Sequence, residues 1–373
     1  MTVIEVPEDL SGLDAAIVQV PNNPAVFLLW PREGDPYLAK TALLRRRLLR
    51  LLKEREKPSR LLNLRHTVRR IEYCLTGSAF ESAILMYELA RRYFPKSYLD
   101  LLKLRMPTYV KLVLTNEFPR SQLTTHLGRA PALYCGPFRS RATAEKFESE
   151  FLDLFQMRRC QEDLVPSPEH PGCIYGEMGM CLRPCQQVVG RDEYLHETAR
   201  AAEFLKSGGR SLLDVIGSAR DRYSEEMIFE EAARQHKRYE KVQEVLKLRD
   251  ELARDIDRMH GVAITFSAAP NAVELWIVRE GHWQEPRRLS FEIQEGKPVS
   301  LDGKLREIFG RLPMRRLGTR ERQEYLALLA RWYYSSWRDG EWLAIESFEN
   351  LPYRKLVHAV SRVARRDVPR EAS

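Results

Sequence analysis

The sequence predicts an α+β protein made of several domains. Short strand and helix patterns alternate near the N-terminus and again in residues 259–373, whereas residues 192–258 are strongly helical. A loop rich in proline and glycine, residues 160–185, carries four cysteines. With 373 residues, 44% hydrophobic and 30% charged, the chain is long enough for two or three packed domains and too apolar for a disordered protein.

The N-terminal elements follow the order strand, strand, helix, strand, helix. Residues 25–30 and 36–40 are expected to form a hairpin, because a turn segment with proline, glycine and aspartate separates two short apolar runs. A helix rich in leucine and arginine is expected over 41–57, a strand over 68–76, and a second helix over 78–94 that ends before a proline. These elements predict a small sheet covered by helices.

The cysteine loop predicts a metal centre. Its cysteines, separated by twelve, seven and three residues, are Cys160, Cys173, Cys181 and Cys185. Four thiolates on a loop with little core of its own suit tetrahedral zinc or a four-iron cluster. The absence of two close Cys-x-x-Cys pairs favours iron and sulfur, and the remaining alternative is four unrelated buried thiols. Cys74 and Cys135 are expected in the core.

Residues 192–258 interleave charged and apolar side chains. Only the Gly208-Gly209 pair and Gly217 interrupt the pattern, so we expect two antiparallel helices, an αα-hairpin. The last segment then changes character: GVAITFSAA and VELWIVREG are typical of paired strands, and helical patterns follow at 321–337 and 352–366. We therefore expect a separate C-terminal α/β module.

Positive charge is concentrated in one segment. Residues 40–70 hold twelve Lys or Arg against two acidic residues, an excess of ten that exceeds the net charge of +8 of the whole chain. Such density predicts sequence-independent phosphate binding, although a merely solvated helix face has the same composition. The sequence shows no secretion signal and no run of eighteen apolar residues, so we expect a cytoplasmic protein without a membrane partner.

The residues around the cysteines resemble a known family. The run MRRC followed by PGCIYGEMGMCLRPC is similar to the UvrC family of nucleotide excision repair, and so are FPR at 118–120 and LYCGPFRS at 133–140. This resemblance implies that the four cysteines hold a 4Fe-4S cluster, with zinc as the alternative.

The N-terminal elements resemble the GIY-YIG nuclease domain of the same family. Pro-Ala-Val-Phe at 24–27 and Tyr-Leu-Ala-Lys at 37–40 stand where that family has Pro-Gly-Val-Tyr and Tyr-Val-Gly-Lys. The resemblance implies that three functional positions are retained, at Tyr37, Lys40 and Arg47. It implies that three others are lost, at Phe27, Leu51 and Met86.

Met86 stands where the family has its metal-binding glutamate. A thioether is a poor ligand for magnesium or manganese, and Glu81 and Glu88 project away from the Met86 direction of an ideal helix, so no catalytic Mg²⁺ is expected. Phosphate binding needs charge rather than a metal. The residues expected to contact DNA are Lys40, Arg45, Arg46, Arg47 and Arg50.

Residues 204–242 resemble the UVR motif, through which UvrC-like proteins contact UvrB. The resemblance places partner contacts at Phe229, Glu230, Ala232 and Ala233. The alternative is purely structural: small alanines let two helices approach while Phe229 fills the gap between them. His236-Lys237 replaces the family's Arg-Asp and reverses a charge.

These expectations give four units: a degenerate GIY-YIG-like domain at 15–100, a linker with the metal-cluster region at 101–192, a UVR-like hairpin at 193–250 and an α/β module at 255–373. The last unit resembles the UvrC region before its RNase H-like nuclease, and we expect that nuclease and a helix-hairpin-helix module to be absent. The expected function is non-cleaving binding of DNA, and of UvrB, in excision repair. The alternatives are an active family endonuclease that makes a single incision, and a zinc-stapled scaffold unrelated to repair.

Overall fold

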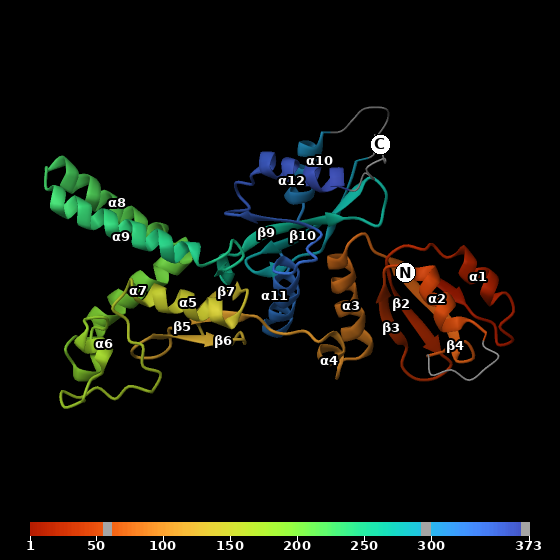
Figure 1. Ribbon diagram of the computed structural model, residues 1–373, viewed down its shortest axis with the longest axis horizontal. Helices are drawn as coiled ribbons and strands as arrows, with labels where there is room; N and C mark the ends of the chain where they lie inside the picture. The colour runs from red at the N-terminus through yellow and green to blue at the C-terminus, as the bar shows by residue number, and fades with distance from the viewer. Residues whose placement is uncertain (55–61, 292–299, 367–373) are drawn as a thin grey trace.

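A computed structural model describes residues 1–54, 62–291 and 300–366 of the chain, and it contains both helices and antiparallel sheets. Three sheets are formed by the described residues, and Figure 1 shows them along an elongated molecule, with the N-terminal sheet at one end and a projecting helix pair at the other. The predicted α+β class is confirmed. No helix in these described ranges is both long and apolar enough to cross a membrane.

The N-terminal sheet has the strand order β1-β4-β2-β3. Its strands are β1 (Thr2–Glu5), β2 (Ala25–Pro31), β3 (Tyr37–Thr41) and β4 (Val68–Leu75). The predicted hairpin is confirmed, with Val26 opposite Lys40, whereas β1 was not predicted and pairs with β4. Helices α1 (Leu13–Gln19) and α2 (Leu44–Leu52) pack on one face of this sheet, and α3 (Ala79–Tyr93) packs on the other.

Both predicted N-terminal helices form. Helix α2 is shorter than predicted, because the chain is already extended at Lys53; residues 55–57 of the prediction lie outside the described residues. Helix α3 begins after Ser78, whose hydroxyl accepts a hydrogen bond from the Glu81 N–H at 3.0 Å, and it ends just before Pro95. The short helix α4 (Tyr98–Leu102) follows.

The middle sheet was not predicted. It has the order β6-β5-β7-β8, formed by β5 (Thr108–Val113), β6 (Arg120–Thr124), β7 (Ala132–Phe138) and β8 (Arg254–Asp255), and α5 (Arg141–Leu152) packs against it. Strand β7 contains Gly136 and Pro137, two residues that weaken the sequence pattern of a strand. Cys135 is fully buried in β7, as expected of a core cysteine.

Three helices, rather than the predicted two, follow the cysteine loop. They are α7 (Arg191–Ser207), α8 (Arg210–Glu225) and α9 (Phe229–Lys247), and α8 and α9 form the projecting antiparallel pair of Figure 1. Gly208 and Gly209 both have positive φ and separate α7 from α8. Gly217 lies inside α8, so the prediction that it interrupts a helix is wrong.

The C-terminal module is an α/β unit, as predicted. Its sheet has the order β11-β10-β9-β13, with β12 also paired to β10. The strands are β9 (His260–Phe266), β10 (Ala272–Arg279), β11 (His282–Trp283), β12 (Arg287–Ser290) and β13 (Gly340–Ile345). Helices α10 (Leu301–Gly310) and α12 (Tyr353–Arg366) cover one face, and α11 (Thr319–Tyr333) lies on the other.

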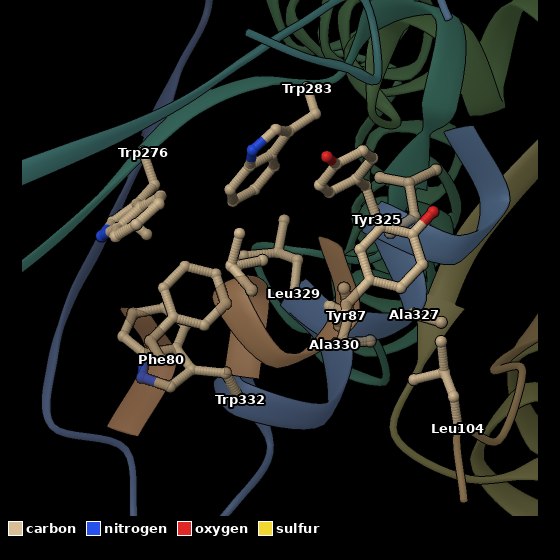
Figure 2. Close-up of a cluster of buried hydrophobic side chains, with 14 of the residues drawn as sticks. Phe80, Tyr87, Leu104, Trp276, Trp283, Tyr325, Ala327, Leu329, Ala330 and Trp332 are labelled. Atoms are coloured by element: carbon tan, nitrogen blue, oxygen red, sulfur yellow. The ribbon is translucent and has the colours of Figure 1, made fainter. Parts of the chain in front are cut away.

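Helix α3 and the C-terminal module share one aromatic core. Phe80 of α3 stacks on Trp332 of α11 with ring centroids 4.6 Å apart, and it meets the edges of Trp276 and Trp283 at 5.5 and 5.8 Å (Figure 2). All four rings are buried. The face of α3 turned to this core is therefore a packing surface between the two ends of the chain.

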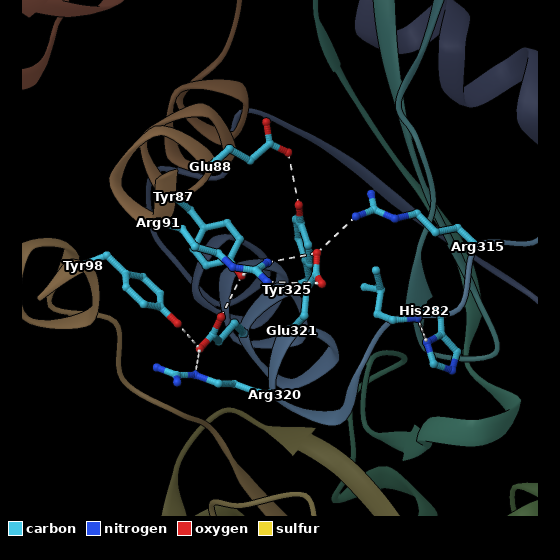
Figure 3. A network of polar contacts seen from close by, with 11 residues as sticks. Tyr87, Glu88, Arg91, Tyr98, His282, Arg315, Arg320, Glu321 and Tyr325 are labelled. Atoms are coloured by element: carbon cyan, nitrogen blue, oxygen red, sulfur yellow. Dashed lines mark hydrogen bonds and ion pairs between the residues drawn. The ribbon is translucent and has the colours of Figure 1, made fainter. Parts of the chain in front are cut away.

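A buried carboxylate joins the same elements. Glu324 of α11 is 1% exposed and accepts hydrogen bonds from the Tyr87 and Tyr98 hydroxyls, each at 2.7 Å, and from Arg320 Nε at 3.0 Å. Figure 3 shows the surrounding network, in which the Tyr325 hydroxyl also donates to Glu88 at 3.1 Å. Because a buried charge is costly without partners, these bonds specify how α3 and α4 sit on α11.

Candidate nucleic-acid interface and cysteine loop

The edge of β3 and the start of α2 form a basic cavity of about 450 Å³. Its lining residues are Lys40, Thr41, Ala42, Leu43, Arg46, Arg47 and Arg50. Four of the five side chains predicted to contact DNA are thus brought together from β3 and one helix. The fifth, Arg45, does not line the cavity.

Two of the three positions that the sequence resemblance implies are retained, Tyr37 and Arg47, are in contact. Arg47 Nη2 donates a hydrogen bond to the Tyr37 hydroxyl at 3.0 Å. Lys40 is exposed at the edge of β3, but partial desolvation by the surrounding protein lowers the pKa of its ammonium group. The positive charge of Arg331 lowers this pKa further, whereas the negative charge of Asp339 raises it. Arg331 and Asp339 belong to the C-terminal module, so residues far apart in the sequence set the charge around Lys40.

The three positions that the resemblance implies are lost, Phe27, Leu51 and Met86, hold packing residues. Phe27 is fully buried and its ring centroid lies 6.2 Å from that of Tyr37, and Leu51 is buried under the same sheet face. Met86 of α3 packs, partly buried, against the shared aromatic core. Apolar side chains therefore occupy all three positions.

The two glutamates of α3 near Met86 have other partners. Glu81 accepts a hydrogen bond from the Gly77 N–H at 2.6 Å, and Glu88 accepts one from Tyr325. Burial raises the pKa of Glu81 to about 7, and the neighbouring charge of Glu274 adds to this shift. To act as a metal ligand in place of a glutamate at position 86, either carboxylate would first have to break its hydrogen bond to Gly77 or to Tyr325.

The raised pKa of Glu81 predicts a pH-dependent stability. The folded protein binds this proton more tightly than the unfolded chain, so the stabilisation is complete below pH 4.5 and is lost as the pH rises through about 7. Glutamine does not titrate, so the free energy of unfolding of Glu81→Gln should not share this loss. Between pH 5 and pH 8, the wild-type free energy of unfolding should fall by on the order of 2 kcal/mol relative to that of Glu81→Gln. Urea unfolding followed by tryptophan fluorescence measures this difference, and parallel pH profiles for the two proteins would contradict it.

The cysteine loop gathers its four thiols around two short turns. Cys173 precedes α6 (Ile174–Glu177), and Cys185 lies in the 3₁₀ turn η1 (Pro184–Gln186). Burial, together with negative charge on the other three cysteines, raises the pKa of the Cys181 thiol to about 11, while the Arg183 N–H opposes the shift. The four sulfurs are therefore within electrostatic range of one another.

Two N–H groups point at these sulfurs. Arg158 Nη1 lies 3.4 Å from Cys160 Sγ, and the Arg183 backbone N–H lies 3.4 Å from Cys181 Sγ. Within the described ranges, no three His, Cys, Asp or Glu side chains are close enough to hold a single metal ion. The donor set is nonetheless all sulfur and carries N–H groups that stabilise negative sulfur, which suits a metal–thiolate centre.

The tip of the α8–α9 pair exposes apolar side chains. Met227, Ile228 and Phe229 are 76%, 43% and 66% exposed, and Met227 has a φ of 58° in the turn. The interpretation that Phe229 fills the gap between the helices is therefore wrong. The buried apolar residues of the pair are instead Leu212, Ile216, Val242 and Val245.

The middle part of the chain matches a known protein family. Residues 109–204 match the family model of the UvrC/Cho excinuclease middle domain. The match runs from β5 through the cysteine loop into α7. The chain is a UvrC-like protein.

Curated relatives agree with this class. UvrABC system protein C of Lachnospira eligens is 22% identical over 78% of this chain, that of Moorella thermoacetica 26% over 62%, and that of Desulfatibacillum aliphaticivorans 27% over 76%. The aligned parts cover 48%, 38% and 47% of these relatives, so the chain spans less than half of their length. No solved structure matches the chain.

Proposed function

We propose that this protein binds DNA in nucleotide excision repair without cutting it, as an accessory or regulatory UvrC-like factor. The observation that carries the proposal is the basic cavity beside β3, lined by Lys40, Arg46, Arg47 and Arg50. These four cations from one strand and one helix line the same cavity, and cationic side chains bind phosphate groups without a metal.

The absence of cleavage is proposed from position 86. GIY-YIG chemistry requires a carboxylate that holds a hard divalent cation, and Met86 offers only a thioether packed against the shared core. The nearby Glu81 and Glu88 are hydrogen-bonded to Gly77 and Tyr325. A domain of this kind keeps its phosphate contacts and lacks the group that stabilises the leaving oxygen.

A single experiment separates binding from cleavage. The protein is mixed with a labelled damaged duplex in Mg²⁺ or Mn²⁺, and the sample is divided between a native gel and a denaturing gel. We expect a mobility shift with both strands intact. Nicked strands on the denaturing gel would indicate an active endonuclease. The lack of a mobility shift on the native gel would contradict the proposal that the protein binds DNA.

We further propose that the four loop cysteines hold a 4Fe-4S cluster. Cys160, Cys173, Cys181 and Cys185 would supply the four sulfur ligands, and the N–H groups of Arg158 and Arg183 would stabilise the negative sulfurs. When bound, such a cluster would cross-link a loop that has little apolar core, fixing residues 160–185 between α5 and α7.

The exposed tip of the helix pair is proposed to contact UvrB. Phe229→Asp should weaken binding to UvrB at least tenfold, because an exposed aromatic side chain at a helix turn is the usual kind of anchor in a protein interface. Val215, 65% exposed on α8 away from the tip, provides the matched control Val215→Asp. Equal binding of UvrB by both variants and wild type in gel filtration would contradict this contact.

A further inference from the structure

A second cavity, of about 620 Å³, lies where the helix pair meets the C-terminal module. Its walls come from the α7–α8 turn, the segment from 249 to 260, and the β13–α12 connection. Six basic side chains line it: Lys206, Arg210, Arg249, Arg254, Arg258 and Lys355. This set is separate from the β3 cavity and was not singled out by any sequence motif.

The acidic side chains of the same cavity do not balance these cations. Glu346 pairs with Arg210 at 3.5 Å, and Glu251 is exposed at the rim. Asp255 is 4% exposed and its carboxylate accepts a hydrogen bond from the Asp257 N–H at 3.1 Å. Three carboxylates therefore face six cations, and only one ion pair between them is recorded among the described residues.

Arg254 and Arg249 are like charges held side by side. Arg254 Nε donates a hydrogen bond to the Glu251 carbonyl at 2.9 Å. Arg249 Nη2 donates to the Gly208 carbonyl at 2.8 Å, and its Nη1 donates to the Ala253 carbonyl at 3.4 Å. Burial, and then the charge of Arg249, lowers the pKa of Arg254. Across the parts of the chain that the structure describes, no carboxylate pairs with either guanidinium, so most of their N–H groups remain available to an anion.

We propose that this cavity binds a phosphate group, either of a nucleic-acid strand or of a free nucleotide. The guanidinium forks of Arg249 and Arg254 would hold the phosphate oxygens, with Arg258 and Lys355 closing the rim. The volume of about 620 Å³ lies within the range of small-molecule sites, so a phosphate carried by a nucleoside is within the proposed class of ligands. The inference does not depend on the proposed role of the β3 cavity.

The test measures binding of inorganic phosphate, adenosine monophosphate and a single-stranded oligonucleotide to the full chain by calorimetry. Arg254→Gln should weaken whichever of these binds at least tenfold, and Lys355→Gln, exposed on α12, should weaken it several-fold without touching the buried part of the site. The control is Arg311→Gln, which removes an exposed charge at the end of α10. For the oligonucleotide, each lost phosphate contact should lower the salt slope by about 0.7.

The outcomes identify the source of the phosphate. If the oligonucleotide and inorganic phosphate compete for the wild-type protein and this competition is lost in Arg254→Gln, the phosphate is that of a nucleic-acid strand. If only the mononucleotide binds, the ligand is a free nucleotide. Equal affinities of Arg254→Gln, Lys355→Gln and Arg311→Gln for every ligand would overturn the inference. In that case a loss of duplex binding on replacing Arg46 would still support the β3 cavity, so the two failures are distinguishable.

Discussion

Replacing both Arg46 and Arg50 by glutamine is expected to weaken duplex DNA binding about 100-fold, if each lost charge-assisted hydrogen bond to phosphate contributes ~1.5 kcal/mol. Both side chains are exposed and line the β3 cavity, so the substitution removes charge without opening the core. The slope of log affinity against log salt should fall by about 1.8, because two released counterions are lost. Fluorescence anisotropy from low to moderate salt measures both quantities.

Arg45 provides the matched control for this experiment. It lies in the same helix and has the same charge, but it does not line the cavity. Arg45→Gln should retain duplex affinity within about threefold, since charges away from the contact are screened by salt. Equal weakening by Arg45→Gln and by the double variant would show that net charge, rather than the cavity, drives binding.

Cys181→Ser is expected to abolish iron binding by the loop, reducing the content from about four iron atoms per chain to near zero. Cys181 is buried and lies within electrostatic range of the three other thiols. Replacing its sulfur by the serine hydroxyl oxygen therefore removes one of the four proposed sulfur ligands. Because a bound metal centre contributes folding free energy, residues 160–185 should also become sensitive to protease. Anaerobic purification with iron, sulfide and zinc analysis gives the result.

Cys74 is the control for the cysteine experiment, because it is half-buried in β4 and outside the loop. Cys74→Ser should keep the full iron and sulfide content. Stoichiometric zinc without sulfide in the wild-type protein would replace the iron–sulfur proposal with a structural zinc site. Loss of iron in both variants would indicate adventitious metal.

The sequence was most informative where local signals agree. Ser78 and Pro95 bracket α3 because a hydroxyl cap begins a helix and a following proline stops one, and the structure places the helix at Ala79–Tyr93. The β2–β3 hairpin was likewise predictable from its turn residues. The density of positive charge over residues 40–70 and the family resemblance predicted a basic site with Lys40, Arg46 and Arg47, and these three residues line one cavity.

Long-range packing could not be predicted in the same way. The middle sheet was missed because β7 contains Gly136-Pro137 and its partner β8 lies more than a hundred residues away. Nothing in the local sequence of α3 indicates that Phe80 meets Trp332 of the C-terminal module. The exposure of Phe229 depends on the turn at Met227, whose positive φ no motif identified.

The central claim is that the protein binds DNA without cutting it, and a reconstituted incision reaction tests this most directly. Damaged duplex DNA, UvrA, UvrB and Mg²⁺ are combined with this protein, and a UvrC that has the family's glutamate serves as the positive control. We predict that the control nicks the DNA whereas this protein leaves both strands intact at concentrations that saturate binding. Metal-dependent nicking by this protein would contradict the account. It would mean that a carboxylate elsewhere in the chain holds the metal, since residue 86 is methionine.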